Sequence, residues 1–216
     1  MNRELKSYLN THIITMYQSF DQAHQINHVK TVIRNAIKIA KDYDVNQDMV
    51  YVIACYHDIG MQFGRNDHHL TGGLFLFEDE RLKSYFTDEE RTVMKEAVED
   101  HRASRKEEPR SIYGKIIAEA DRDIDPDIVI LRTVLFGLKH YPNLDEEDHF
   151  LRAFSHIQEK YGPNGYLKLW LDTEKNKDGL KKIHMLLENR DLMKSIIIKH
   201  YRNFHGKDEK EMPIED

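Results

Sequence analysis

MVYVIACYHDIG, residues 49–60, is apolar at nearly every position up to Tyr56 and then turns polar. The apolar run predicts a helix from about residue 47 to 58 that lies in the middle of the fold, with Gly60 as its stop. His57 and Asp58 stand side by side at the end of this helix. The pair alone has two interpretations, a polar helix end that faces water or half of a metal site.

Helical periodicity extends outward from this stretch. Apolar residues from Val29 to Ala40 recur at steps of three and one, which predicts an amphipathic helix over 28–41. The same pattern predicts further helices at 68–79, 87–102, 109–120, 126–138, 144–162, 177–188 and 190–204. Thr87 and Glu90 predict a capping box, Pro109 and Pro126 predict helix starts, and YGPNGY at 161–166 predicts a turn.

No useful period-two alternation of a strand and no internal repeat occurs in the sequence. We therefore expect an all-α protein, a single-domain helical bundle over residues 1–216. Its core is expected at 20–140, with the helices of 141–206 packed on that core and a frayed polar tail at 207–216.

Composition excludes several classes of protein. The formal net charge of −6 and the pI near 6.1 argue against a general nucleic-acid binder. Cys55 is the only cysteine, so no intramolecular disulfide and no CxxC motif can form. No signal-peptide pattern and no membrane-length apolar run is present, so we expect a cytoplasmic protein without a membrane partner. The sequence carries no signal for an oligomeric state.

Histidines and aspartates recur at the inner ends of the predicted helices. Besides His57 and Asp58, these are His28, His101 and Asp121, and His69 in NDHHLTGG could be a sixth member. Burying one such group costs several kcal/mol unless a partner compensates it, and one divalent cation would compensate all of them. We expect the adjacent His68 to be a loop residue.

Each of these residues also has an interpretation without metal. A histidine beside an apolar stripe can be a hydrogen-bonded core residue, Asp121 can pair with Arg122 or Arg132, and Asp58 can be a solvated helix end. Composition and spacing alone leave both interpretations open.

The ordered set His28, His57–Asp58, Asp121 resembles the H…HD…D signature of the HD superfamily of metal-dependent phosphohydrolases. The flanking stretches NHVKTVIRNA, ACYHDIG and AEADRDIDP resemble the family as well, over about residues 20 to 140. The resemblance implies an all-α fold in which these four residues bind a divalent ion (Mn, Fe, Co, Ni, Mg or Zn).

Two further stretches, DHHLTGG and AVEDHRAS, resemble the subset of the family that binds two ions. There the resemblance implies that His69 and His101 complete a binuclear site bridged by Asp58. The segment from His69 to ADRDIDP is more loosely similar to HD-class diadenosine tetraphosphate hydrolases. HRAS stands where those enzymes usually have a His-Thr pair and is similar to small HD nucleotide pyrophosphatases, so the number of ions, one or two per chain, and the substrate stay open.

The resemblance implies hydrolysis of a phosphoester or phosphoanhydride of a nucleotide or similar small phosphorylated molecule by hydroxide formed at the metal. His57 and Asp58 are the expected catalytic residues, with Asp58 orienting the water or carrying its proton. Basic residues close to the proposed ligands are candidates for binding phosphate, and Arg102 is favoured. The others are Lys30, Arg65 and Arg105.

Two other functions remain open. One is a mixed-valent di-iron oxygenase with the same six ligands, and the other is a non-catalytic nucleotide-binding module.

Overall fold

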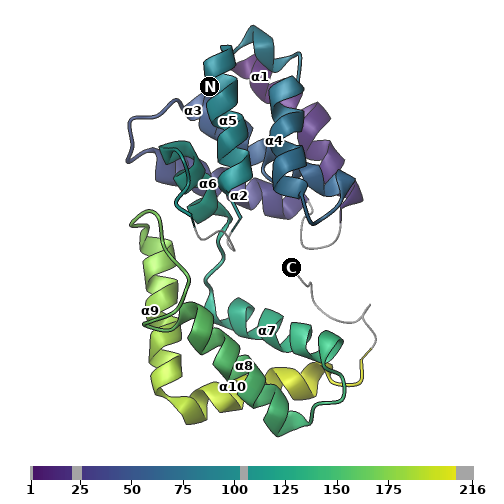
Figure 1. Cartoon of the computed structure of the whole chain (residues 1–216), viewed down its shortest axis with the longest axis vertical. Helices are drawn as coiled ribbons and strands as arrows, with labels where there is room; N and C mark the ends of the chain where they lie inside the picture. The colour runs from purple at the N-terminus through teal and green to yellow at the C-terminus, as the bar shows by residue number, and fades with distance from the viewer. Residues whose placement is uncertain (1, 21–25, 103–106, 208–216) are drawn as a thin grey trace. The chain divides into compact units, whose positions relative to one another are not determined.

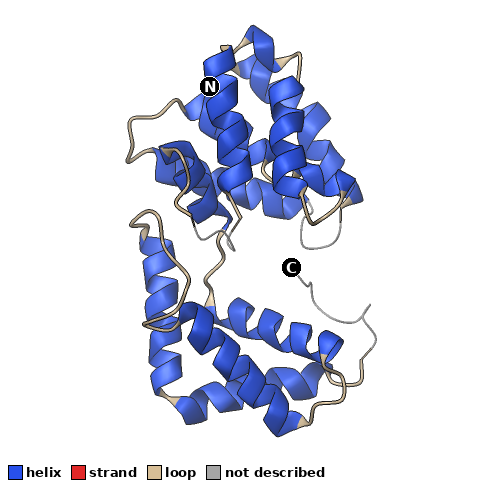
Figure 2. Cartoon of the chain, in the orientation of Figure 1, coloured by secondary structure: helices blue, strands red, loops and turns tan. Residues whose placement is uncertain are grey.

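The computed structural model describes residues 2–20, 26–102 and 107–207, and helices are the only regular elements in these ranges (Figure 2). The predicted all-α fold is therefore confirmed. The chain divides into two compact units, Met1–Arg122 and Asp123–Asp216 (Figure 1). No helix in the described part of the chain is long and apolar enough to cross a membrane.

The first unit is built around one central helix. Its elements are α1 (Arg3–Tyr8), a π-helical turn (Leu9–Ile13), a 3₁₀ segment (Ile14–Ser19), α2 (Ile26–Ala40), α3 (Gln47–Tyr56), a second 3₁₀ segment (Ile59–Phe63), α4 (His68–Glu78), a short 3₁₀ turn (Leu82–Ser84), α5 (Asp88–Asp100) and α6 (Ile112–Asp121). Every residue of α3 from Met49 to Tyr56 is buried, because α2, α5 and α6 all pack against it. The central position predicted for this helix is confirmed.

Side-chain caps fix where the helices begin. Thr87 and Glu90 form the predicted capping box, with bonds of 3.2 and 2.9 Å. Pro126 is the first residue of α7 (Pro126–His140), as predicted. The start predicted at Pro109 is wrong: α6 begins at Ile112, because the Ser111 hydroxyl accepts the Gly114 amide at 3.2 Å.

We expected Gly60 to end α3, and this prediction is wrong. The helix already ends at Tyr56, and Gly60 lies in the following 3₁₀ segment. A Cβ at Gly60 would lie 2.0 Å from the His68 carbonyl oxygen. Gly72 is the opposing residue in α4, and a Cβ there would lie 3.2 Å from the Gly60 nitrogen. These glycines cost helix propensity but let α4 approach the segment after the HD pair.

The second unit has a hydrophobic core of its own. Its helices are α7 (Pro126–His140), α8 (Glu146–Tyr161), α9 (Glu174–Glu188) and α10 (Arg190–Phe204). Ile130, Phe150 and Ile197 are fully buried members of that core. The predicted turn is confirmed by the Gly165 amide, which donates to the Gly162 carbonyl at 2.8 Å.

The division of the chain differs from the one we expected. The core predicted for 20–140 ends at Arg122, and α7 belongs to the second unit because α8 and α10 complete its buried face. The packing of residues 141–206 on the first bundle stays a prediction. The predicted tail falls mostly on residues 208–216, outside the described ranges.

Candidate metal centre

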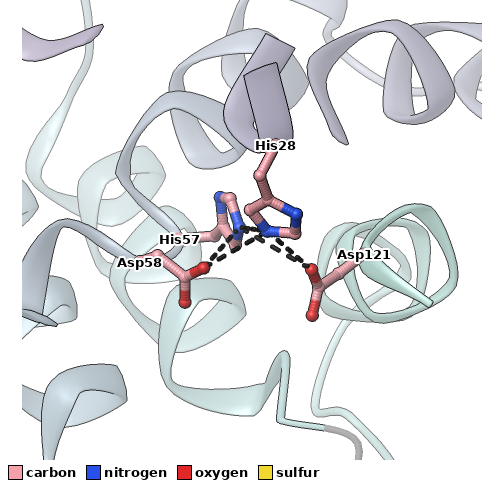
Figure 3. A group of neighbouring side chains, drawn as sticks. All are labelled: His28, His57, Asp58 and Asp121. Carbon is pink, nitrogen blue, oxygen red and sulfur yellow. Dashed lines mark hydrogen bonds and ion pairs between the residues drawn. The ribbon is translucent and has the colours of Figure 1, made fainter. Parts of the chain in front are cut away.

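Four side chains of the first unit point at one another (Figure 3). His28 comes from the first turns of α2, and Asp121 is the last residue of α6. His57 and Asp58 come from the turn between α3 and the 3₁₀ segment that follows it. Residues far apart in sequence thus meet where three helices end or begin.

The atoms that could bind an ion are close together. His28 Nε2 lies 3.1 Å from His57 Nε2, 3.3 Å from Asp58 Oδ2 and 3.2 Å from Asp121 Oδ1. His57 Nε2 lies 3.0 Å from Asp58 Oδ2 and 3.8 Å from Asp121 Oδ1. Bonds of about 2.1 Å to a single ion would separate neighbouring ligand atoms by roughly 3.0–3.4 Å at octahedral or tetrahedral angles. Four of the five separations lie in that range, and only the 3.8 Å between His57 Nε2 and Asp121 Oδ1 exceeds it.

A second group shares Asp58 with the first. Asp58 Oδ1 lies 3.3 Å from His101 Nε2 and 3.5 Å from His68 Nε2. The two carboxylate oxygens of Asp58 therefore face different sets of ligands, Oδ2 the first group and Oδ1 the second. This is the arrangement that a bridging carboxylate requires.

The imidazoles of the site are oriented by one repeated contact. Nδ1 of His57, His68 and His101 bonds to the backbone carbonyl three residues earlier, at 2.9, 2.7 and 2.6 Å. A carbonyl can only accept, so each Nδ1 carries the proton. This contact leaves Nε2 of each ring as the atom that faces Asp58, as metal-binding histidines require.

The ionisable side chains of the first group shift one another's pKa values. Burial raises the pKa of the Asp121 carboxyl, but the hydrogen bond with His28 and the charge of His57 outweigh burial and bring this pKa to about 2. Burial also opposes ionisation of Asp58, yet His57, His101 and His28 hold its pKa well below the ordinary value. Burial lowers the pKa of His28, whereas its bonds to Asp121 and Asp58 raise that pKa to about 10. An ion that binds here therefore competes with a proton on His28.

The structure brings together five of the six predicted ligands and leaves the sixth, His69, outside both groups. His28, His57, Asp58, His101 and Asp121 lie in the two groups, but the second group contains His68 and not His69. Successive residues of a helix point about 100° apart, so only one histidine of the pair can face Asp58. The loop position expected for His68 is wrong, since His68 is the first residue of α4 and is buried.

A sequence signal for His68 did exist. His68, Gly72 and Leu76 are spaced by four and are all buried, so His68 continues the inner stripe of α4. Tyr17 was missed altogether. It is fully buried, and its hydroxyl contacts the backbone of the HD pair, but no motif in its surroundings indicates that position.

The basic candidates separate into different places. Arg102 is half-buried, and its Nη1 donates to the Asn66 carbonyl at 3.1 Å, which holds it against the segment that leads into α4. Arg65 is exposed, and its backbone carbonyl is the partner of His68 Nδ1. Lys30 is exposed on α2, about 200° around the helix from His28. Arg105 lies outside the described residues.

These features define a class: an all-α protein with a buried histidine–carboxylate cluster of metal-ligand type at the meeting point of its helices. The family model "HD domain" matches residues 26–123. Residues 26–123 therefore match the HD domain family in sequence.

Two solved structures have a similar fold. One is a predicted HD superfamily hydrolase from an uncultured Thermotogales bacterium, with 20% identity, a TM-score of 0.50, and coverage of 86% of this chain and 88% of that chain. The other is Bacillus subtilis YpgQ in complex with ADP, with 17% identity, a TM-score of 0.54, and coverage of 94% and 96%. No curated protein matches the sequence.

Proposed function

We propose that the first unit is a metal-dependent phosphohydrolase that cleaves a phosphoester or phosphoanhydride of a nucleotide or similar small phosphorylated molecule. The observation that carries the proposal is the sharing of Asp58 between two groups of ligand atoms. One structural neighbour was crystallised with ADP, which makes nucleotides the first substrates to try.

His28, His57, Asp58 and Asp121 would hold one divalent ion, and Asp58, His68 and His101 would hold another. The donor set of imidazoles and carboxylates suits Mn, Fe, Co, Ni, Mg or Zn. When bound, such an ion acidifies a coordinated water and neutralises charge that develops on phosphoryl oxygens.

The chain's own residues supply orientation. The buried Asp58 carboxylate presents one oxygen to each group of ligands, so it can accept a hydrogen bond from the attacking water and fix its direction. His57 is fully buried and tethered through Nδ1, so it keeps the ligand atom Nε2 in place while substrate enters.

Arg102 is the residue that we propose for binding substrate phosphate. It follows His101 in the chain, and its Nη1 donates to the carbonyl of Asn66, two residues before His68, so its guanidinium lies beside the segment that leads into the second group. Arg102→Ala should raise KM for the nucleotide that is hydrolysed at least severalfold, whereas Lys30→Ala on the outer side of α2 should not. Equal effects of the two variants would contradict this assignment. Arg65 is the weaker proposal, because its side chain is exposed.

We also propose that the protein acts in the cytoplasm on a small molecule, with neither nucleic acid nor membrane as partner. The net charge of −6 disfavours polyanionic partners. Cell fractionation of the tagged protein would contradict the location if the protein sedimented with membranes or nucleic acid.

The central test combines metal analysis with a substrate panel. Wild-type protein should carry one or two ions per chain after reconstitution with Mn, Fe, Co, Ni, Mg or Zn, and should release phosphate or pyrophosphate from a nucleotide. His57→Ala should lose the metal and at least 100-fold of the activity. His12→Ala, at an exposed histidine of the same unit, is the matched control and should behave as wild type.

Other outcomes separate the alternatives. Unchanged metal content in His57→Ala would refute the metal centre. Two tightly held irons with substrate-dependent uptake of O₂ would identify an oxygenase. Nucleotide binding in calorimetry without turnover, whichever ion is supplied, would identify a non-catalytic module.

A further inference from the structure

Tyr17 lies in the N-terminal segment that precedes residues 26–123, the part of the chain that matches the HD domain family. Its side chain is fully buried. Its ring lies tilted against Phe20 at 4.9 Å and stacks on His57 at 6.4 Å between centroids. The hydroxyl reaches the end of α3. There it contacts two backbone groups, the Cys55 carbonyl at 2.9 Å and the Asp58 amide at 3.3 Å.

The direction of both hydrogen bonds is fixed by chemistry. The carbonyl can only accept, so the Tyr17 hydroxyl donates to Cys55; the amide can only donate, so the same oxygen accepts from Asp58. Burial, followed by the charge of Asp58, raises the pKa of Tyr17 well above its ordinary value, so the hydroxyl keeps the proton that it donates. One hydroxyl therefore spans the turn that carries His57 and Asp58.

The turn needs such a contact because a helix ends there. The last carbonyls of a helix have no intrahelical partner. Here the Ala54 carbonyl accepts a hydrogen bond from His57 Nδ1, and the Cys55 carbonyl accepts one from the Tyr17 hydroxyl. Asp58 follows with φ −108° and ψ 6°, between α3 and the 3₁₀ segment. Side chains thus hold the backbone at the point from which the Asp58 carboxylate projects.

We propose that Tyr17 is a positioning residue of the metal centre: its hydroxyl fixes the His57–Asp58 turn so that each Asp58 oxygen faces one group of ligands. The inference rests on the proposed metal centre but not on any substrate. The two groups depend on Asp58 to different degrees. Among the residues that the structure describes, the first also has His28, His57 and Asp121, whereas the second has only His68 and His101. Loss of the hydroxyl should therefore weaken the second group more.

Tyr17→Phe removes the hydroxyl and keeps the ring, and Tyr51→Phe is the matched control. Tyr51 is a buried tyrosine of α3, and its hydroxyl bonds at 3.3 Å to Asn10 in the same N-terminal segment. Chelator-treated full-length proteins are titrated with Mn²⁺ by calorimetry, and bound Mn²⁺ is examined by electron paramagnetic resonance. Tyr17→Phe should bind the second Mn²⁺ about 10- to 100-fold more weakly and lose the spin coupling of a bridged pair. Tyr51→Phe should keep both.

Hydrogen–deuterium exchange provides a readout without metal. The peptide that contains the Asp58 amide should exchange faster in metal-free Tyr17→Phe than in wild type or Tyr51→Phe. Mn²⁺ affinities within twofold of wild type, or unchanged exchange, would overturn the role of Tyr17. Wild-type protein that binds Mn²⁺ but hydrolyses no nucleotide would contradict the proposed function alone. Wild-type protein that binds no Mn²⁺ would overturn both.

Discussion

His68 and His69 differ by one position in the chain and by their surroundings in the fold. The His68 imidazole is turned towards Asp58 by its bond to the Arg65 carbonyl. The His69 ring lies 5.7 Å from the His68 ring and belongs to neither group of ligand atoms. The pair therefore offers a test in which each histidine is the control for the other.

His68→Ala should lower the number of bound Mn²⁺ ions by one, because Asp58 and His101 alone leave the second group with two ligands. His69→Ala should retain the wild-type number. Mn²⁺ stoichiometry by calorimetry measures both. Loss of an ion from His69→Ala together with its retention in His68→Ala would restore the ligand set that we expected from the sequence.

The residues that could be predicted are those whose type and order carry the information. His28, His57, Asp58 and Asp121 follow from their order along the chain and from their places at helix ends. The choice between His68 and His69 depends on how a helix is rotated, and a helix start that is misjudged by one residue reverses it. Tyr17 could not be predicted, because a tyrosine whose hydroxyl bonds only to backbone leaves no pattern in the sequence.

At the scale of elements, close approach of backbones decides where the second group lies. The 3₁₀ segment Ile59–Phe63 runs against α4, and Gly60 leaves no room for a Cβ between the two backbones. Sequence patterns predicted most helices near their observed positions. They failed where a local contact overrides propensity, at the Ser111 cap and at the end of α3 after Tyr56.

Gly60→Ala should displace the start of α4. The new Cβ would lie 2.0 Å from the His68 carbonyl oxygen and 2.6 Å from the Gly72 nitrogen, and backbone atoms cannot rotate away. We expect a loss of about 1–3 kcal/mol in the free energy of unfolding and weaker binding of the second Mn²⁺. Chemical unfolding and calorimetry measure these effects.

Gln62→Ala is the control for Gly60→Ala, because Gln62 is an exposed residue of the same 3₁₀ segment. It should leave Mn²⁺ binding unchanged. If Gly60→Ala were as stable as wild type and bound two Mn²⁺ ions normally, the close contact could not be what positions His68.

At the scale of the whole molecule, the proposed chemistry lies in the first unit, while the second unit contains a buried histidine that makes its stability sensitive to acid. His149 is buried in α8, with its ring 5.0 Å from the Tyr201 ring. Burial lowers the pKa of His149, and the charges of Arg152 and His205 lower it further, whereas Asp145 acts in the opposite direction. The folded unit therefore resists protonation of this side chain more than the unfolded chain does.

The sign of the pH effect follows from this difference. An unfolded histidine titrates near pH 6.5, so above that pH His149 is neutral in both states and costs nothing. Below it the unfolded chain binds the proton more readily, and stability of the second unit is lost as the pH falls. Trp170, the only tryptophan, lies in this unit and reports its unfolding by fluorescence.

His149→Phe should therefore make the stability of the second unit less dependent on pH. The variant keeps a ring against Tyr201 and removes the titrating group. Urea midpoints from Trp170 fluorescence should fall less between pH 7.5 and pH 5.5 in the variant than in wild type. His140→Gln, at an exposed histidine of the same unit, should follow wild type. Parallel declines in wild type and His149→Phe would mean that other groups account for the loss of stability in acid.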